Sequence, residues 1–167
     1  MSELTVIVAA RAIHVMGGVI WAGAIFIMTG VILPMMARHG SEGFGRWTGM
    51  IARRVGPISG IAALLTVASG VYLFAELHPH DASASGLVLK VGAATALLSW
   101  ITGFLVGRPI GTKLAELSQS AGDSASPDLA ERIEALRRRA TLTTRLVAAL
   151  LGISVLSMAV FRYVGAL

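Results

Sequence analysis

Four long runs of apolar residues divide the chain. Stretches without Asp, Glu, Lys or Arg extend over 12–37, 55–75, 91–107 and 146–161. A helix needs about 20 predominantly apolar residues to cross a bilayer, and the two shorter runs reach that length when flanking Lys and Arg side chains extend to the interface. We therefore predict an all-α bundle of four transmembrane helices, at about 5–34, 54–76, 86–108 and 141–164, in a single integral membrane domain over 1–167.

The longest polar segment lies between the third and fourth runs. Apolar residues recur there at helical spacing, at Ile110, Leu114 and Leu117 and again at Leu129, Ile133 and Leu136. Ser126, Pro127 and Asp128 are typical of a helix start: a cap, a proline at the first helical position and an acid at the positive end of the dipole. We expect helices three and four to extend beyond the membrane as an antiparallel helical stalk over 109–140, with a kink at Pro109 and a flexible tip at 118–126.

Basic residues are distributed unevenly among the connections. The loop after the first helix carries four arginines, and the connection from Arg108 to Arg145 carries seven Lys and Arg, whereas the segment ELHPHDASASG at 76–86 has none. By the positive-inside rule the two basic connections are cytoplasmic and both termini face outward, as in a multi-pass protein of the bacterial inner membrane. The start, MSELTVIVAA, lacks the basic region of a signal peptide, so we expect the first helix to be retained.

Composition supports the membrane assignment and narrows the partners. Hydrophobic residues make up 55% of the chain and charged residues 14%, against roughly 25% in an ordinary soluble domain. The net charge of +5 then reflects topology and attraction to anionic membrane lipid rather than a nucleic-acid partner. The absence of cysteine excludes disulfides and thiolate metal sites. Glycine pairs at 56/60 and 103/107 favour close helix packing and are compatible with a homodimer.

An ionisable pair lies near the outer end of the first helix. The sequence ARAIHVMGGVIWAG at 10–23 places Arg11 and His14 one helical turn apart, with Gly18 and Trp21 further along. Lys90 begins the third helix from the same side, so we expect Lys90 and His14 to lie at similar depth. Ionisable groups inside a membrane are costly and often mark a functional site.

These residue types suit one wall of a haem pocket. An imidazole can bind iron while its other nitrogen is held by an acceptor, and Arg11 points toward the surface, where a haem propionate would emerge. Gly18 leaves room for a ring beside Trp21. Lys90 could pair with a propionate or serve as a second axial ligand. The alternative is that His14 is a hydrogen-bonding link between helices and that Lys90 is an interface anchor.

Four motifs carry a resemblance to a known group. The segments IHVMGGVIWAG, FGRWTGMIARRVGPISGIAALLTVASGVYLF, LVLKVGAATALL and GRPIGTKLAEL resemble the CopD-like superfamily of four-helix bacterial membrane proteins, which includes HemJ-type protoporphyrinogen oxidases. In that type a first-helix His and a third-helix Lys are the hallmark polar pair, and His14 and Lys90 fall on those positions. The resemblance implies haem b near the outer face, a redox or electron-transfer role, and a quinol or small redox partner.

The chain also departs from the HemJ-type pattern. Pro34 comes later than the proline of that pattern, and the extended stalk is not one of its features. The chain resembles the uncharacterised members of the CopD-like superfamily more closely than the HemJ type. We therefore treat protoporphyrinogen oxidation as an alternative and expect a haem protein with a redox or electron-transfer role.

Two further functions stay open. The first is copper transport or resistance, because imidazole and thioether ligands suit copper. Its candidate ligands are Glu76, His78, His80 and Asp81 in the outer loop and Met35, Met36 and His39 at the inner end. No continuous ladder of Met or His joins the two ends. The second is a structural or assembly subunit in which the stalk docks a partner.

Overall fold

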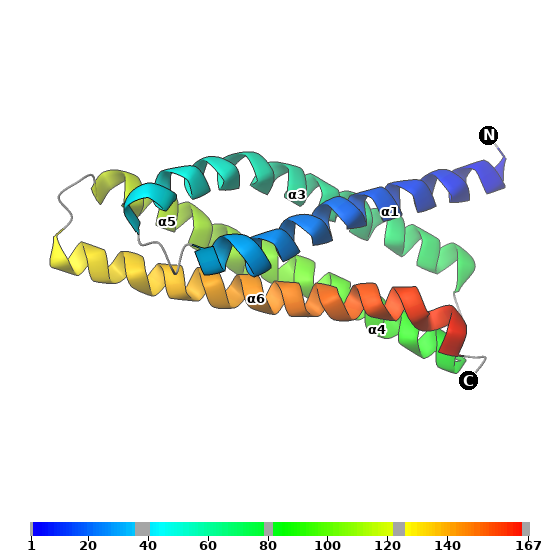
Figure 1. Ribbon diagram of the computed structural model, residues 1–167. Coiled ribbons are helices and arrows are strands. Elements are labelled where there is room, and N and C mark those ends of the chain that lie inside the picture. Colours follow the sequence, from blue (N-terminus) through cyan, green and yellow to red (C-terminus); the bar gives the residue numbers. More distant parts are fainter. Residues whose placement is uncertain (1, 36–40, 79–81, 122–125, 165–167) are drawn as a thin grey trace.

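The computed structural model is helical in every element of the ranges that it describes, which are residues 2–35, 41–78, 82–121 and 126–164, with 41–53 described by their backbone alone. The elements in chain order are α1 (Glu3–Ile27), the π-helical η1 (Met28–Ile32), α3 (Ser41–Leu77), α4 (Ala84–Thr102), the π-helical η2 (Gly103–Gly107), α5 (Arg108–Ala121) and α6 (Pro127–Val164) (Figure 1). Within the described ranges, four helical stretches are long and apolar enough to cross a membrane. The predicted bundle of four long apolar helices is therefore confirmed.

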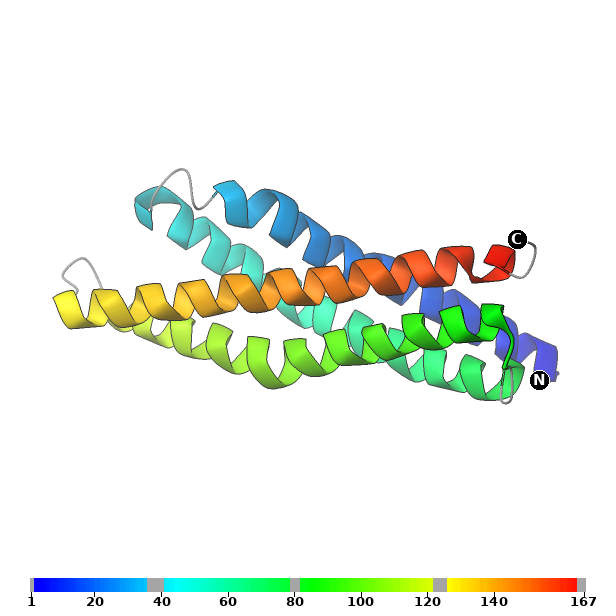
Figure 2. The ribbon, with the colours of Figure 1, turned by 90° about the horizontal axis from the view of Figure 1, so that it is seen from below.

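The bundle consists of two helix pairs. Helix α1 crosses α3 and packs chiefly against it (Figure 1). Helices α4 and α5, joined through η2, form a long rod that lies antiparallel to α6 (Figure 2). The two pairs meet where α1 and η1 contact α6 and where α3 contacts α4.

A small core joins the two pairs. Trp21 of α1 lies at its centre, 5% exposed, against alanines of α3 and aliphatic side chains of α6: Ala62, Ala63, Val147 and Leu151. Ile25, Val67 and Trp100 pack around this cluster. Many other large apolar side chains are exposed. This distribution suits a protein in lipid, where an outward-facing Leu or Val costs nothing and association depends on close packing.

Glycines set how closely the helices of each pair approach. A Cβ at Gly17 would lie 2.6 Å from Thr66 Oγ1, so α1 and α3 meet at a separation that only a glycine allows. Gly92 serves α4 in the same way, since a Cβ there would lie 3.0 Å from Ser157 Cβ of α6. By contrast, a Cβ at Gly56 or Gly60 would meet no atom within 4 Å. Among the described residues, that predicted packing motif therefore makes no close contact with another helix.

Each π-helical segment ends two residues before a proline. A proline lacks the N–H that would bond to the carbonyl four residues earlier, and its ring crowds that carbonyl. For Pro34 that carbonyl belongs to Gly30 in η1, and for Pro109 it belongs to Leu105 in η2. A π turn widens the helix at these points and relieves the crowding. The irregularity expected at Pro109 thus takes the form of a π segment, whereas Pro57 lies inside α3 without one.

The helices are longer than the hydropathy pattern indicates. Residues 41–53, which the sequence assigns to a loop, belong to α3, because backbone hydrogen bonding continues beyond the apolar stretch that hydropathy detects. In the stalk segment α5 packs against α6 and continues to Ala121, and 122–125 lie outside the described residues. Helix α6 begins at Pro127 as predicted, and Ser126 Oγ accepts a hydrogen bond from the N–H of Leu129 at 3.4 Å.

Candidate functional site around His14

His14 lies on the face of α1 that packs against α3. Ala10, His14, Gly17 and Trp21 follow one another at spacings of four, three and four, which places them on one side of a helix. Ala10, Gly17 and Trp21 are buried and His14 is half-buried. The imidazole is therefore held at a helix–helix contact.

A backbone carbonyl of α3 fixes the protonation pattern of the ring. His14 Nδ1 lies 2.8 Å from the carbonyl oxygen of Thr66. A carbonyl can only accept, so Nδ1 must carry the proton and donate it. In the neutral ring the other nitrogen, Nε2, then bears a lone pair. No hydrogen bond to Nε2 is present among the described residues. The neutral side chain therefore offers a bound, oriented imidazole with one nitrogen available as a ligand.

The carbonyl of Thr66 belongs to a local polar network on α3. Thr66 Oγ1 donates to the carbonyl of Ala62 at 2.7 Å. Ser69 Oγ donates to the carbonyl of Leu65 at 2.6 Å and lies 3.2 Å from that of Thr66. Each hydroxyl is thus satisfied within α3, which leaves the Thr66 carbonyl as the acceptor that ties α3 to His14. Such an interhelical bond contributes about 0.6 kcal/mol on average in a membrane protein, and up to about 1.7.

Gly70 provides the space for the imidazole. A Cβ at this position would lie 2.8 Å from His14 Cε1 and 3.0 Å from Nδ1, closer than the 3.4 Å at which ordinary van der Waals contact begins. The ring therefore lies directly against the backbone of α3, one turn beyond the carbonyl that it bonds. Gly70 and Thr66 together determine where the ring lies.

The other residues predicted for the site are distributed over three environments. Gly18 faces α3, where its Cβ position is 3.7 Å from Thr66 Cγ2, and Trp21 is part of the core between the two helix pairs. Arg11 is exposed on α1. Lys90 is exposed on α4, a helix that packs chiefly against α6, whereas the contacts of His14 are with α3. The structure therefore brings His14 and Gly18 together at Thr66 and places Lys90 in the other helix pair.

His78, a candidate copper ligand, lies against aromatic rings at the end of α3. Its ring centroid is 6.5 Å from that of Phe74 and 6.1 Å from that of Phe161 of α6, with the second pair edge to face. His78 is half-buried, although the sequence favours a solvated position in a polar loop. It therefore helps to join α3 to α6 at this end of the bundle.

The remaining copper candidates are distributed differently. His80, Asp81, Met36 and His39 lie outside the described residues. Glu76 is exposed at the end of α3, and Met35 is exposed at the end of the first helical stretch. Within the part of the chain that the structure describes, no three His, Cys, Asp or Glu side chains gather as a metal-binding group would require.

Thr66 and Gly70 are the site residues that the sequence analysis does not identify. Ala62, Thr66 and Gly70 recur at intervals of four, which is the small-residue spacing that lets two membrane helices approach closely. Glycine pairs alone do not indicate this face of α3, because Gly70 is its one glycine among the three residues. Including Ala and Thr as small residues would have indicated this face of α3.

Comparison with known proteins adds no relative. No protein-family model, curated protein or solved structure matches the chain. The resemblance to the CopD-like superfamily stays a prediction from the motifs.

Proposed function

We propose that this protein is a multi-pass protein of the bacterial inner membrane that binds haem b through His14 and serves a redox or electron-transfer role. The observation that supports the proposal best is the 2.8 Å hydrogen bond between His14 Nδ1 and the Thr66 carbonyl. Metal-ligating histidines commonly donate their second ring N–H to a carbonyl or carboxylate, which fixes the tautomer and makes the free nitrogen more basic. His14 has this arrangement, with Nε2 as the nitrogen that would ligate iron.

Other residues would contribute charge. Arg11 lies three positions before His14 on α1, so the two side chains extend from neighbouring places on the helix surface. Arg11 and Lys90 are exposed cations, and both suit the carboxylates of haem propionates. Lys90 as a second axial ligand is the alternative role. When bound, haem would supply one-electron transfer, at a potential that the axial ligand and nearby positive charge adjust.

The proposal relies on His14 more than on its predicted neighbours. The contacts of Gly18 and Trp21 are with Thr66 and with the core, respectively, so these residues already have a structural role. The position of Gly70 against the ring adds support of a different kind, because a ligand nitrogen must be held in a constant orientation.

The same hydrogen bond favours a second candidate function, that of a structural or assembly subunit without a cofactor. A histidine that donates to a carbonyl of a neighbouring helix stabilises the helix pair by itself. In this case Nε2 of His14 would bind no ligand.

Absorption spectroscopy distinguishes the two candidates. The protein is purified in mild detergent, supplied with haem, and its oxidised and dithionite-reduced spectra are recorded. We expect a Soret band that shifts on reduction in the wild type and in His78→Ala, which serves as a control because His78 contacts aromatic rings. The band should be lost in His14→Asn. The amide nitrogen of asparagine can still donate a hydrogen bond from near the position of Nδ1, but asparagine has no nitrogen at the position of Nε2 that could ligate iron.

The outcomes separate ligation from helix linkage. A wild-type protein that remains colourless after haem addition would refute haem binding and leave the structural function. A Soret band that persists unchanged in His14→Asn would refute His14 as the ligand. Carbonate washing of the source membranes tests the location independently, since an integral protein stays in the pellet.

A further inference from the structure

A basic groove lies between α5 and α6, away from His14. We call it the stalk groove; its volume is about 270 Å³, and it is lined by Lys113, Leu117, Arg132, Ala135, Leu136 and Arg139. Three of the six residues are cations, and they come from two helices. Leu117, Ala135 and Leu136 add apolar surface between them.

The cations of the stalk groove are only partly neutralised. The ion pairs of the described residues are Arg132 with Asp128 at 3.2 Å and Arg138 with Glu134 at 3.5 Å, both within α6. Among the described residues, Lys113 and Arg139 belong to neither pair. Two exposed positive charges therefore remain at the groove, one on each helix.

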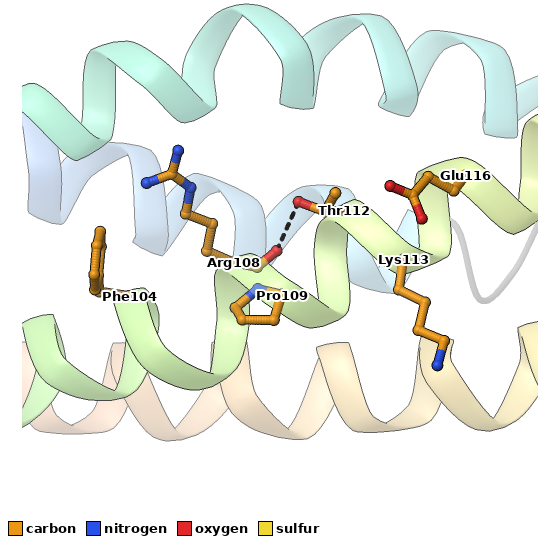
Figure 3. Close-up of a pocket in the computed structure, with 6 residues that line it drawn as sticks. All are labelled: Phe104, Arg108, Pro109, Thr112, Lys113 and Glu116. Atoms are coloured by element: carbon orange, nitrogen blue, oxygen red, sulfur yellow. Dashed lines mark hydrogen bonds between the residues drawn. The ribbon is translucent and has the colours of Figure 1, made fainter.

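A second groove adjoins the first and is less suited to an anion. It has a volume of about 520 Å³ and follows α5 from Phe104 past Arg108 and Thr112 to Glu116. Figure 3 shows Arg108 and Glu116 on the side of α5 away from α6, whereas Lys113 points to the opposite side, toward α6. The guanidinium of Arg108 lies over the Phe104 ring at 5.5 Å, and the carboxylate of Glu116 would repel an anion. Lys113 thus directs its charge toward the stalk groove.

Exposed apolar side chains continue from the stalk groove toward the apolar part of the bundle. Leu142 and Leu146 follow Arg139 at spacings of three and seven, so they share its face of α6, and they are 64% and 52% exposed. On α5, Pro109 precedes Lys113 by one turn and is also exposed. The surface is therefore cationic at the groove and apolar next to it, in the order in which an amphiphile would be bound.

We propose that the stalk groove binds the headgroup phosphate of an anionic glycerophospholipid. Lys113 and Arg139 would pair with the phosphate, and the acyl chains would extend along Leu142 and Leu146. Basic pockets between membrane helices near the bilayer surface are suited to anionic headgroups. The inference rests on the membrane placement in the proposed function and is independent of haem.

The depth of the groove agrees with that of a headgroup. Lys113 is five residues beyond Arg108, and Arg139 is six residues before Arg145, which corresponds to about 7.5 and 9 Å along the helices. Arg108 and Arg145 mark the ends of the apolar runs. A headgroup layer is about 5–8 Å thick on each side, and the long stems of both side chains can reach back across the difference.

The volume also fits. The stalk groove, at about 270 Å³, has room for several water molecules and therefore for a phosphate group.

Native mass spectrometry of the full-length protein in detergent tests the inference. Phosphatidylglycerol is titrated into wild type, into Lys113→Gln/Arg139→Gln, and into Arg137→Gln/Arg138→Gln, which removes the same charge from neighbouring positions outside the groove. We expect the groove variant to bind phosphatidylglycerol about 30-fold more weakly, roughly fivefold for each cation, and the control variant to bind like wild type. Lys113→Arg/Arg139→Lys keeps both charges and should also bind like wild type.

Several results would overturn the inference. Equal binding by wild type and the groove variant would do so, as would equal weakening in the control variant, which would indicate a diffuse charge effect. Phosphatidylcholine bound as tightly as phosphatidylglycerol would remove the preference for an anion. Displacement of the lipid by inorganic phosphate would indicate a site for the free ion. Haem absorbance recorded on the same samples reports on His14 separately, and release of the protein by carbonate would refute the membrane placement.

Discussion

Replacing Gly70 by alanine tests how the imidazole of His14 is held. The new methyl group would lie 2.8 Å from His14 Cε1, so the ring must move away from α3. Overpacking of this kind costs about 1–3 kcal/mol, and the hydrogen bond to Thr66 contributes up to about 1.7 kcal/mol more if it breaks. The better helix propensity of alanine offsets about 0.5–1 kcal/mol. We expect the free energy of unfolding to fall by about 2 kcal/mol, the middle of the range of about 0–4 kcal/mol that these contributions span.

The assay is unfolding in mixed detergent micelles with increasing SDS, followed by far-ultraviolet circular dichroism. Gly60→Ala is the matched control, because Gly60 lies on the same helix and a Cβ there would meet no atom within 4 Å. This variant should be as stable as wild type or up to about 1 kcal/mol more stable.

A double-mutant cycle with His14→Ala isolates the cause. Once the imidazole is removed, the methyl group at residue 70 has room, so Gly70→Ala should cost nothing further in that background. If the two losses of unfolding free energy simply add, the destabilisation does not arise from the contact between residue 70 and the ring. The imidazole of His14 then does not lie against Gly70.

Three further substitutions test the packing of the bundle, with the free energy of unfolding as the measurement. Gly17→Ala should lose about 0–2.5 kcal/mol, which is the overpacking cost less the gain in helix propensity, because the methyl group would lie 2.6 Å from Thr66 Oγ1. Gly18→Ala should be neutral or up to about 1 kcal/mol more stable, because its methyl group would make an ordinary contact at 3.7 Å. Equal effects of the two substitutions would contradict the close approach of α1 and α3. Trp21→Ala should cost about 3 kcal/mol or more by opening a cavity between the two helix pairs, and a loss under 1 kcal/mol would argue against its central position. Ser99→Ala removes a fully buried hydroxyl that donates to the Val147 carbonyl at 3.3 Å, so we expect a loss of about 0.5 kcal/mol; a gain in stability would show that this long bond contributes nothing.

Hydropathy and helix-start signals account for much of the fold. The four long helices follow from the length of the apolar runs, and the start of α6 at Pro127 follows from the residues around it. Neither kind of signal indicates how a helix adjusts its hydrogen bonding around a proline. The sequence therefore predicted a kink at Pro109 but neither of the two π segments. The first turns of α3 were also missed, because residues 41–53 include too many polar residues to register as part of a membrane helix.

The site illustrates a different limit. The position of a residue along a helix gives its depth, and this reasoning suggested that His14 and Lys90 lie at one level. Depth does not determine which helices are neighbours. That choice depends on the meshing of small residues far apart in the sequence, such as Gly17 with Thr66 and His14 with Gly70. The sequence therefore drew attention to the imidazole of His14 but did not predict that α3 is the helix in contact with it.

The π segments before Pro34 and Pro109 have a consequence for how the chain can vary. A π turn is equivalent to one extra residue inserted into an α-helix, and one residue corresponds to a rotation of about 100°. Deleting a single residue from 28–32 or 103–107 would restore regular α winding and leave the residues that follow at nearly the same azimuth, because the wider π turn already absorbs the rotation of the extra residue. Homologous chains that lack either proline should therefore show a one-residue gap at that place in an alignment, and no change of length elsewhere in the same helix.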